Sequence, residues 1–385
     1  MKIAIISLYS ALYRGGNYGT LFQNYALQAY LKNIGHEPFW VRTKSLSDIR
    51  YIKSIYNLYL YALDSTIALA KGAHKTRKPS GDSARPYETF FERHVDHTAR
   101  VYTRNDLLND PPAADIYIAG SDQIWTKMVP HFFLDFVPTS SRRIAYAASA
   151  RWDGLTDEWL LAAREKLARF DQVSVREAAG VDVCRRAGRE DTTLVLDPVF
   201  LMEKTHYIDL VRDEGDDTPY DSPFLMAYFV SLENPKELPV AFLERFSARQ
   251  GWDLKADFIS NAAQHMPRNR LMNPTPTQWL NAIDKSKFVL TNSFHGMAFA
   301  ILMERPFAVL LKDGKRVGKN ERITNMLRFL GLEDRAIGMD LFYSGDFDAL
   351  ADRLMAGIDW DEVRPKLQKW RDISREFLIN ATEAR

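Results

Sequence analysis

The sequence predicts an α/β protein with parallel sheets. Short apolar runs that end in polar residues alternate with segments of helical periodicity along the whole chain. Apolar runs of this kind are typical of strands that are buried in a parallel sheet. At 385 residues the chain is too long for a single ordinary core. We therefore expect two domains, each with its own group of parallel strands.

The expected strands fall into two groups, divided somewhere around residues 180–220. The runs that predict strands are Lys2–Ile6, Pro38–Val41, Asp115–Ala119, Arg143–Ala147, Gln172–Val175, Thr193–Leu196, Phe224–Phe229, Leu254–Ile259, Lys287–Leu290 and Phe307–Leu311. Helical patterns lie at Thr20–Asn33, Thr156–Arg169, Glu177–Arg186, Pro235–Gln250, Thr277–Asp284, Met297–Met303, Arg322–Leu330 and Asp359–Ile379. The stretch 211–223 is acidic and rich in turn formers, which predicts a surface loop or linker.

Composition indicates a soluble globular enzyme. Apolar residues make up 46% and charged residues 26% of the chain, which excludes disordered and fibrous classes. Lys and Arg number 51 against 50 for Asp and Glu, so no global field recruits nucleic acid and any anion site must be local. The single cysteine, Cys184, excludes an internal disulfide framework and a cysteine-rich metal site.

Two features concern the cellular location. The apolar part of Met1–Ser7 is too short for a signal peptide, and no run approaches the roughly 18–20 apolar residues of a membrane span. We expect a cytoplasmic protein, at most peripheral at the inner membrane face. In the segment 51–78, aromatic Tyr51–Leu63 precedes basic Lys71–Lys78. Either a packed helix is followed by a mobile loop, or tyrosines and basic residues contact anionic headgroups at a membrane surface.

The stretch 287–306 is the most informative about function. Its turn, Thr291–Gly296, lies between an apolar strand and a helix that ends before Pro306. Open α/β sheets bind ligands at that edge, and a helix N-terminus favours phosphate or carboxylate. His295 on this turn can exchange a proton near neutral pH. The simpler alternative is that Ser293 or Asn292 caps the helix and the imidazole is merely packed.

Other strand ends carry similar polar groups. In the first turn, Gly15, Gly16 and Gly19 allow a close approach of backbone to ligand, although a plain loop fits equally well. After the strand that ends at Ala119, Gly120–Trp125 offers amides, a carboxylate in Asp122 and a ring in Trp125 for stacking on a sugar. The alternative for this segment is an Asx turn with a buried tryptophan.

Three further positions complete this set. Arg176 ends a strand and suits bidentate binding of carboxylate or phosphate, unless Arg176 and Glu177 form a solvated pair. Asp197 lies at another strand end, and the simpler alternative is that it is only a turn former before Pro198. The basic loop Lys312–Arg322 precedes a helix and fits either a phosphate-binding loop or a solvated run of charges.

The order of these motifs resembles the polysaccharide pyruvyl transferase family over about residues 3–332. Gly120–Trp125 and Thr291–Gly296 are its most specific parts. The resemblance implies two Rossmann-like domains that face each other across a cleft, in a glycosyltransferase-B-like arrangement. We expect residues 1–185 to form the acceptor side, with a helical, basic insertion near 46–98. Residues 186–358 would form the donor side, and 359–385 a helix packing back across both.

The resemblance also implies an activity: transfer of the enolpyruvyl group of phosphoenolpyruvate to a sugar, usually as a cyclic ketal. Arg176 and His295 match residues that contact phosphoenolpyruvate. Thr20 departs from the pattern, because many members carry an acidic residue there. The acceptor implied is a galactose- or mannose-type sugar of a capsular or exopolysaccharide precursor, either lipid-linked or free. Phosphoenolpyruvate is a substrate here, and the reaction calls for no metal and no separate cofactor.

Site roles follow from this chemistry. His295 is the expected general acid, and Asp122 the base on the acceptor hydroxyl. The expected donor-binding residues are Arg176, Ser293, Phe294, Gly296, Lys312 and Arg322. The expected acceptor-binding residues are Gly16, Asn17, Gly19, Gly120, Ser121, Gln123 and Trp125.

Two other functions remain compatible with the same residues. The first is a nucleotide-sugar-dependent glycosyltransferase, in which the His295 turn and the Lys312–Arg322 loop would bind a diphosphate. The second is an idle sugar-binding module. The charged groups at several strand ends argue against that module.

Overall fold

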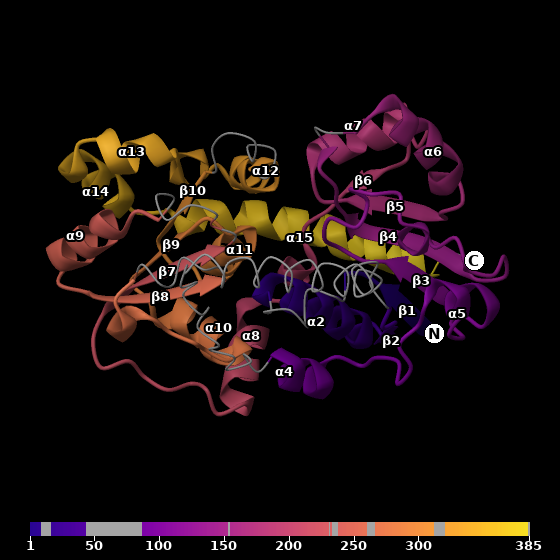
Figure 1. Cartoon of the computed structure of the whole chain (residues 1–385), viewed down its shortest axis with the longest axis horizontal. Helices are drawn as coiled ribbons and strands as arrows, with labels where there is room; N and C mark the ends of the chain where they lie inside the picture. The colour runs from indigo at the N-terminus through magenta and orange to yellow at the C-terminus, as the bar shows by residue number, and fades with distance from the viewer. Residues whose placement is uncertain are drawn as a thin grey trace, which may run out of the picture.

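The computed structural model describes residues 1–8, 17–43, 87–152, 155–230, 232, 238–259, 266–311 and 320–383. Their strands form two sheets, which occupy the two halves of the molecule (Figure 1). The six-stranded sheet has the order β2-β1-β3-β4-β5-β6, and the five-stranded sheet the order β11-β10-β9-β7-β8. Within each sheet, the neighbouring strands pair in parallel. The predicted α/β class is confirmed.

The elements of the first half are β1 Lys2–Ile6, α2 Tyr18–Asn33, β2 Glu37–Trp40, α4 Tyr87–His94, α5 Arg104–Asn109, β3 Ile116–Ala119, β4 Arg142–Ala148, α6 Asp157–Leu167, β5 Gln172–Val175, α7 Ala178–Arg186 and β6 Thr193–Leu194. Those of the second half are α8 Lys204–Asp213, β7 Phe224–Val230, α9 Val240–Gln250, β8 Asp253–Ile259, α10 Pro276–Lys285, β9 Phe288–Thr291, α11 Phe294–Leu302, β10 Phe307–Leu310, α12 Glu321–Leu330, β11 Ala336–Ile337, α13 Met339–Ser344, α14 Phe347–Met355 and α15 Trp360–Glu383.

Each predicted strand is present, with ends that differ from the predicted ones by at most two residues. The two-residue strand β11 was not predicted, because it is too short to show a pattern. Helix α11 begins at Phe294, three residues before the predicted start, because Ser293 caps it. Helices α4, α5, α8, α13 and α14 were also missed. The aromatic and basic segment 51–78 lies outside the described residues, so both interpretations of it remain predictions.

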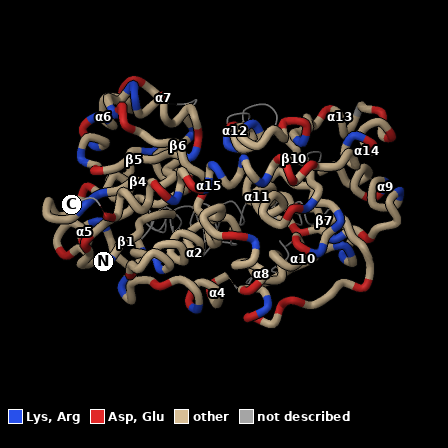
Figure 2. Tube along the Cα trace, turned by 180° about the vertical axis from the view of Figure 1, so that it is seen from behind, with Lys and Arg blue, Asp and Glu red and all other residues tan. Residues whose placement is uncertain are grey.

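An apolar contact between α2 and the helices of the second half joins the two halves. Tyr18 of α2 stacks on Trp279 of α10, with 4.7 Å between ring centroids. Phe22 of α2 meets Phe299 of α11 edge-on at 5.2 Å. Helices α2 and α11 are nearly free of charged residues, whereas the outer helices carry side chains of both charges (Figure 2). This apolar packing fixes the N-termini of α2 and α11 relative to each other.

The final helix, α15, runs along both halves (Figure 1). Near its middle, the Ser374 hydroxyl accepts a hydrogen bond from the Leu196 amide at 2.9 Å. Near its end, Arg142 of β4 donates to the Thr382 carbonyl at 3.1 Å. Trp370 stacks on Phe329 of α12. The helix therefore contacts elements of both halves.

The acidic stretch 211–223 is more ordered than a free linker. Helix α8 continues to Asp213, and the carboxylate of Asp216 is bound at the start of α10. It accepts hydrogen bonds from Thr275 at 2.8 Å, Thr277 at 2.5 Å and Gln278 at 3.0 Å. A carboxylate at a helix N-terminus is favoured by the free amides and the dipole there. This contact guides the chain from α8 to β7.

Candidate active site

Polar side chains from both sheets meet where α2 and α11 lie side by side (Figure 1). Asp122 follows β3, Arg176 follows β5, and Asp197 follows β6. From the second half come the first turn of α11, after β9, and the first turn of α12, after β10. Each group follows the carboxyl end of a parallel strand, the edge at which open α/β sheets bind ligands.

Arg176 forms the centre of this cluster, and its side chain is 1% exposed. Its Nη1 donates to Asp197 Oδ2 at 2.6 Å and to Ser121 Oγ at 3.2 Å. Its Nε donates to Glu177 Oε1 at 3.0 Å, and Nη2 lies 3.5 Å from Asp122 Oδ1. Burial alone lowers the pKa of Arg176, but these carboxylates raise it above its ordinary value. The guanidinium is permanently charged, and each of its three nitrogens has a protein partner.

The neighbour Glu177 is buried as well, so the interpretation of Arg176 and Glu177 as a solvated pair is wrong. The Glu177 side chain is 3% exposed. Besides Arg176 it binds the Ser149 hydroxyl at 2.7 Å and the Trp152 indole N–H at 2.9 Å. Sequence reasoning missed Ser149 and Trp152, because nothing in their local pattern points to Glu177.

Asp197 connects the two halves. Its Oδ1 accepts the Val199 amide at 3.2 Å, as expected of a turn former before Pro198. Its Oδ2 binds Arg176 and lies 3.6 Å from Nε2 of His295. Burial raises the pKa of Asp197, but the charges of His295 and Arg176 hold it well below its ordinary range. Asp197 therefore carries a negative charge between the Arg176 guanidinium and the His295 ring.

His295 lies within the first turn of α11 rather than on a loop before it. Ser293 caps the helix by accepting the Gly296 amide at 3.3 Å. Gly296 packs against β9, since a Cβ there would lie 2.5 Å from the Thr291 hydroxyl. The imidazole of His295 covers Gly19 of α2, where a Cβ would lie 1.9 Å from Nδ1 of the ring. The ring thus has Gly19 on one side and Asp197 on the other.

Arg322, near the start of α12, is the second arginine of the cluster. Both guanidinium groups lie over the Phe294 ring, that of Arg176 at 5.5 Å and that of Arg322 at 5.7 Å from its centroid. The Nε of Arg322 is buried and has no hydrogen-bond partner. Burial and the charge of Arg176 lower the pKa of Arg322. The Nε of Arg322 thus lacks a partner, whereas each nitrogen of Arg176 has one.

Asp122 has an unusual backbone, with φ of 79° in the left-handed region. Its Oδ2 accepts the Thr20 hydroxyl at 3.1 Å, and its Oδ1 accepts the Gln123 amide at 2.9 Å. Burial raises its pKa, but the charges of Arg176, Arg322 and His295 lower it below its ordinary value. Its side chain is 15% exposed, so this carboxylate is ionised and partly open to solvent.

Comparison with known proteins agrees with this arrangement. A model of the family described as "Polysaccharide pyruvyl transferase" matches residues 17–313. The chain belongs to the polysaccharide pyruvyl transferase family. No curated protein sequence matches it.

Solved structures show the fold to which this member of the family belongs. The UDP-N-acetylglucosamine 2-epimerase of Rickettsia bellii has a TM-score of 0.52 and 10% identity, with 99% of this chain and 95% of that chain covered. A putative enzyme of the same name from Listeria monocytogenes has a TM-score of 0.51 and 12% identity, with 100% and 96% covered. At this identity the likeness concerns the fold alone. The fold has two Rossmann-like domains in the glycosyltransferase-B-like arrangement.

The predicted acceptor-binding residues differ from one another in burial and in hydrogen-bond partners. Asn17 caps α2 by accepting the Gly19 amide at 2.9 Å. Gly120 packs under β1, where a Cβ would lie 3.2 Å from the Ser7 Cβ. Ser121 is buried against Arg176 and Asp197, whereas Gln123 is partly exposed beside Asp122. Gly16 and the donor-site candidate Lys312 lie outside the described residues.

The proposed role of Trp125 in stacking on a sugar is wrong. The side chain is fully buried, and its indole N–H donates to the Phe132 carbonyl at 3.0 Å. Its ring stacks on Phe133 at 5.5 Å between centroids. The buried tryptophan of the alternative is confirmed. The Asx turn is not formed, because the Asp122 carboxylate accepts the amide of Gln123, the next residue, and the Ile124 amide donates to the Asp122 backbone carbonyl.

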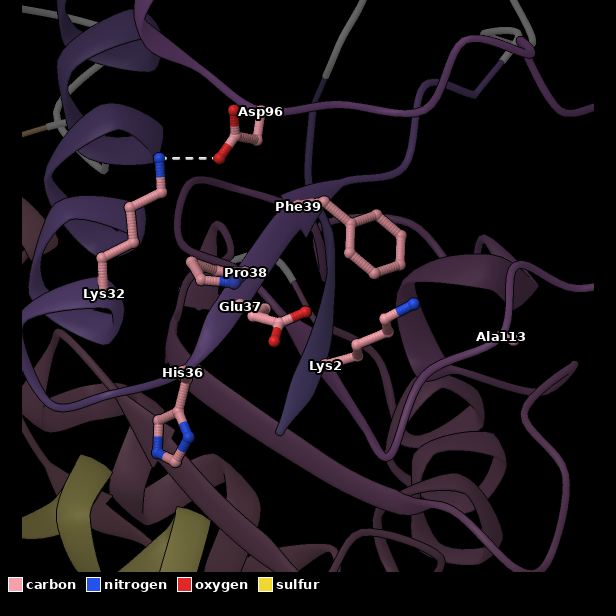
Figure 3. Close-up of a pocket in the computed structure, with 8 residues that line it drawn as sticks. All are labelled: Lys2, Lys32, His36, Glu37, Pro38, Phe39, Asp96 and Ala113. Atoms are coloured by element: carbon pink, nitrogen blue, oxygen red, sulfur yellow. Dashed lines mark ion pairs between the residues drawn. The ribbon is translucent and has the colours of Figure 1, made fainter.

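The opposite edge of the first sheet carries a pocket of about 480 Å³ (Figure 3). It lies at the amino ends of β1 and β2, beside Lys2 and Glu37. Lys32 and Asp96 form an exposed ion pair across it at 2.7 Å. None of the clustered groups of the candidate site lines it.

No helix in the described part of the chain is long and apolar enough to cross a membrane.

Proposed function

We propose that the protein transfers the enolpyruvyl group of phosphoenolpyruvate to a galactose- or mannose-type sugar of a bacterial surface polysaccharide precursor. The products are a cyclic pyruvate ketal and phosphate. Membership of the polysaccharide pyruvyl transferase family supports this. The observation that carries it is the buried Nε of the Arg322 guanidinium, which has no hydrogen-bond partner. Such a group, placed beside a second arginine, calls for an anionic ligand.

The donor carries a carboxylate and a phosphate close together, so the site must supply cationic groups and free amides. Arg176 is poorly suited to direct contact, because a ligand would have to displace Asp197 or Glu177 from it. Arg322 is better suited, since a bound anion would satisfy Nε and offset the repulsion from Arg176. The first amides of α11 and α12 add to this anion site.

In the proposed reaction, a proton moves to the methylene carbon of the donor, which becomes a methyl group and leaves the adjacent carbon cationic. One sugar hydroxyl adds to that carbon and loses its proton to a base. The second hydroxyl then forms the other C–O bond as the bond to phosphate breaks. One of the two hydroxyl protons restores the acid that protonated the methylene carbon. The other leaves with hydrogen phosphate.

Two side chains suit the proton transfers. His295 lies beside the anion site and is the proposed acid toward the methylene carbon. Asp122 is the proposed base on the acceptor hydroxyl, because its ionised carboxylate is partly exposed. Gln123, the next residue, is placed to contact the same sugar. Under this proposal Asn17, Gly120 and Ser121 hold the site in shape.

Purified protein incubated with phosphoenolpyruvate and a panel of galactosides and mannosides tests this function. The expected result is phosphate release that requires both substrates, with a sugar that gains the mass of one pyruvate ketal. Parallel incubations replace phosphoenolpyruvate with UDP-sugars. Release of UDP from those incubations, without consumption of phosphoenolpyruvate, would replace this proposal with the glycosyltransferase alternative.

A further inference from the structure

The carboxylate of Asp197 divides its two oxygens between two tasks. Oδ1 accepts the Val199 amide, which satisfies the turn before the short 3₁₀ helix Pro198–Leu201. Oδ2 is not needed for that turn and points into the cluster. It lies 2.6 Å from Nη1 of Arg176 and 3.6 Å from Nε2 of His295. A turn former alone would not require this second set of contacts.

The other side of the pair is the imidazole of His295. Its Nε2 is buried and makes no hydrogen bond of normal length, so Asp197 Oδ2 at 3.6 Å is the acceptor that it faces. A bare Nε2 would direct its lone pair at a carboxylate, which is repulsive. A protonated Nε2 would instead be attracted to it, and the protein interior weakens this attraction little. The geometry therefore favours an Nε2 proton and leaves Nδ1, on the Gly19 side, for exchange.

We propose that Asp197 is a positioning residue that holds a proton on Nε2 of His295 and aims the ring, so that Nδ1 exchanges the proton used in catalysis. This inference rests on the proposed role of His295 as the acid. Arg176 completes the arrangement, because its bond to Oδ2 keeps Asp197 ionised and fixed in place. Arg176 thereby acts on the reaction through Asp197 and makes no contact with the donor.

The arrangement also crosses the molecule. Asp197 follows the last strand of the first sheet, whereas His295 belongs to α11 of the second half. The proton-exchanging ring is therefore aimed by a side chain of the opposite half. Its geometry depends on the contact between α2 and α11 that sets the two halves together.

The direct test is NMR of the histidine ring nitrogens in the wild-type protein, with the His295 signals assigned from their loss in His295→Gln. The expected result is a ring that carries a proton on Nε2, with altered ring-nitrogen shifts in Asp197→Asn. Asp284→Asn is the matched control, since Asp284 is also a buried carboxylate paired with cations, but outside this site. A wild-type ring protonated only on Nδ1 would overturn the proposal, and this outcome does not depend on the folding of Asp197→Asn.

A double-mutant cycle supplies the kinetic test. Asp197→Asn is expected to lower kcat about tenfold to a hundredfold with little change in KM for phosphoenolpyruvate, because the acid is misaligned rather than the donor site removed. In the His295→Gln background, the same change is expected to cost almost nothing further. Full additivity of the two effects would show that Asp197 does not act through His295. If no pyruvyl transfer is detected while Nε2 carries the proton, the proposed function fails and the positioning contact stands.

Discussion

The imidazole of His295 fills the space that the side chain of any residue other than glycine would occupy at position 19. A Cβ on Gly19 would lie 1.9 Å from Nδ1 and 2.4 Å from Cγ of the ring. The backbone of Gly19 is part of α2, so the ring and not the backbone conformation excludes larger residues here. Two helices from opposite halves of the molecule thus meet at the candidate acid.

Gly19→Ala is expected to lower kcat at least tenfold, because His295 must move away from Asp197 and productive geometry is sensitive to shifts of about 1 Å. Stability is expected to fall, since the gain of about 1 kcal/mol in helix propensity offsets only part of the steric cost of overpacking. Steady-state kinetics and thermal unfolding measure the two effects. Gly357→Ala is the control, as a Cβ there meets no atom within 4 Å. Unchanged turnover in Gly19→Ala would show that the ring is not held where catalysis needs it.

Arg322→Ala is expected to weaken the binding of phosphoenolpyruvate by roughly 2–4 kcal/mol, because a buried charged contact to the anion is lost. The folded state should be no less stable, since the Nε of Arg322 is unpaired and Arg176 repels its charge. Calorimetric titration with phosphoenolpyruvate and thermal unfolding measure these effects. Arg328→Ala, on the exposed face of the same helix, should leave affinity unchanged. Equal affinities of Arg322→Ala and wild type would remove Arg322 from the donor site.

Arg176→Ala, in contrast to Arg322→Ala, is expected to lower the free energy of unfolding rather than the affinity for phosphoenolpyruvate alone. It leaves Asp197 and Glu177 buried without their cation, which typically costs about 3–5 kcal/mol of folding free energy. Arg176→Lys should recover only part, because a single ammonium cannot bind the separate carboxylates in the same geometry. Urea unfolding of both variants measures the cost. A stable Arg176→Ala protein that has lost only its affinity for phosphoenolpyruvate would return Arg176 to direct donor contact.

Trp125→Phe tests the correction at that position. The variant loses the hydrogen bond to the Phe132 carbonyl and part of the stack on Phe133, so stability should fall by about 1–3 kcal/mol. The KM for the acceptor sugar should not change, because the indole is fully buried. Unfolding curves and acceptor saturation are the measurements. An increase in KM without loss of stability would mean that the ring does reach the sugar.

Local sequence patterns were sufficient to locate the strand ends but not the contacts made there. Alternation of apolar runs placed Asp122, Arg176 and His295 at the carboxyl ends of strands, where parallel sheets gather such residues. The same pattern could not show that Trp125 points into the core, because a tryptophan after a strand suits both the core and a binding site.

The engagement of Arg176 was also beyond the sequence. Its carboxylate partners include Asp197, which is 21 positions away, and Asp122, which is 54 away. The contact of Asp197 with His295 links the two halves of the fold. Such pairings depend on how α2 packs against α11 rather than on any local periodicity.

The buried carboxylates also predict how stability depends on pH. Asp122 and Asp197 have pKa values lowered in the folded protein, so the unfolded chain binds protons more readily at acidic pH. Their contribution to stability is fully present above the unfolded value of about 3.9 and is lost as pH falls toward the folded values. Urea unfolding from pH 7 down to pH 3 should show a free energy that is steady to about pH 5 and then falls.

The slope of that acid loss identifies its source. In Asp197→Asn one of the two depressed carboxylates is gone, so the free energy of unfolding should start lower at pH 7 and decline less between pH 5 and pH 3. Asp340→Asn, which changes a carboxylate outside the buried cluster, should keep the wild-type slope. If Asp197→Asn and wild type lose stability in parallel, Asp197 is not held ionised by Arg176. The charge arrangement proposed around His295 would then be incorrect.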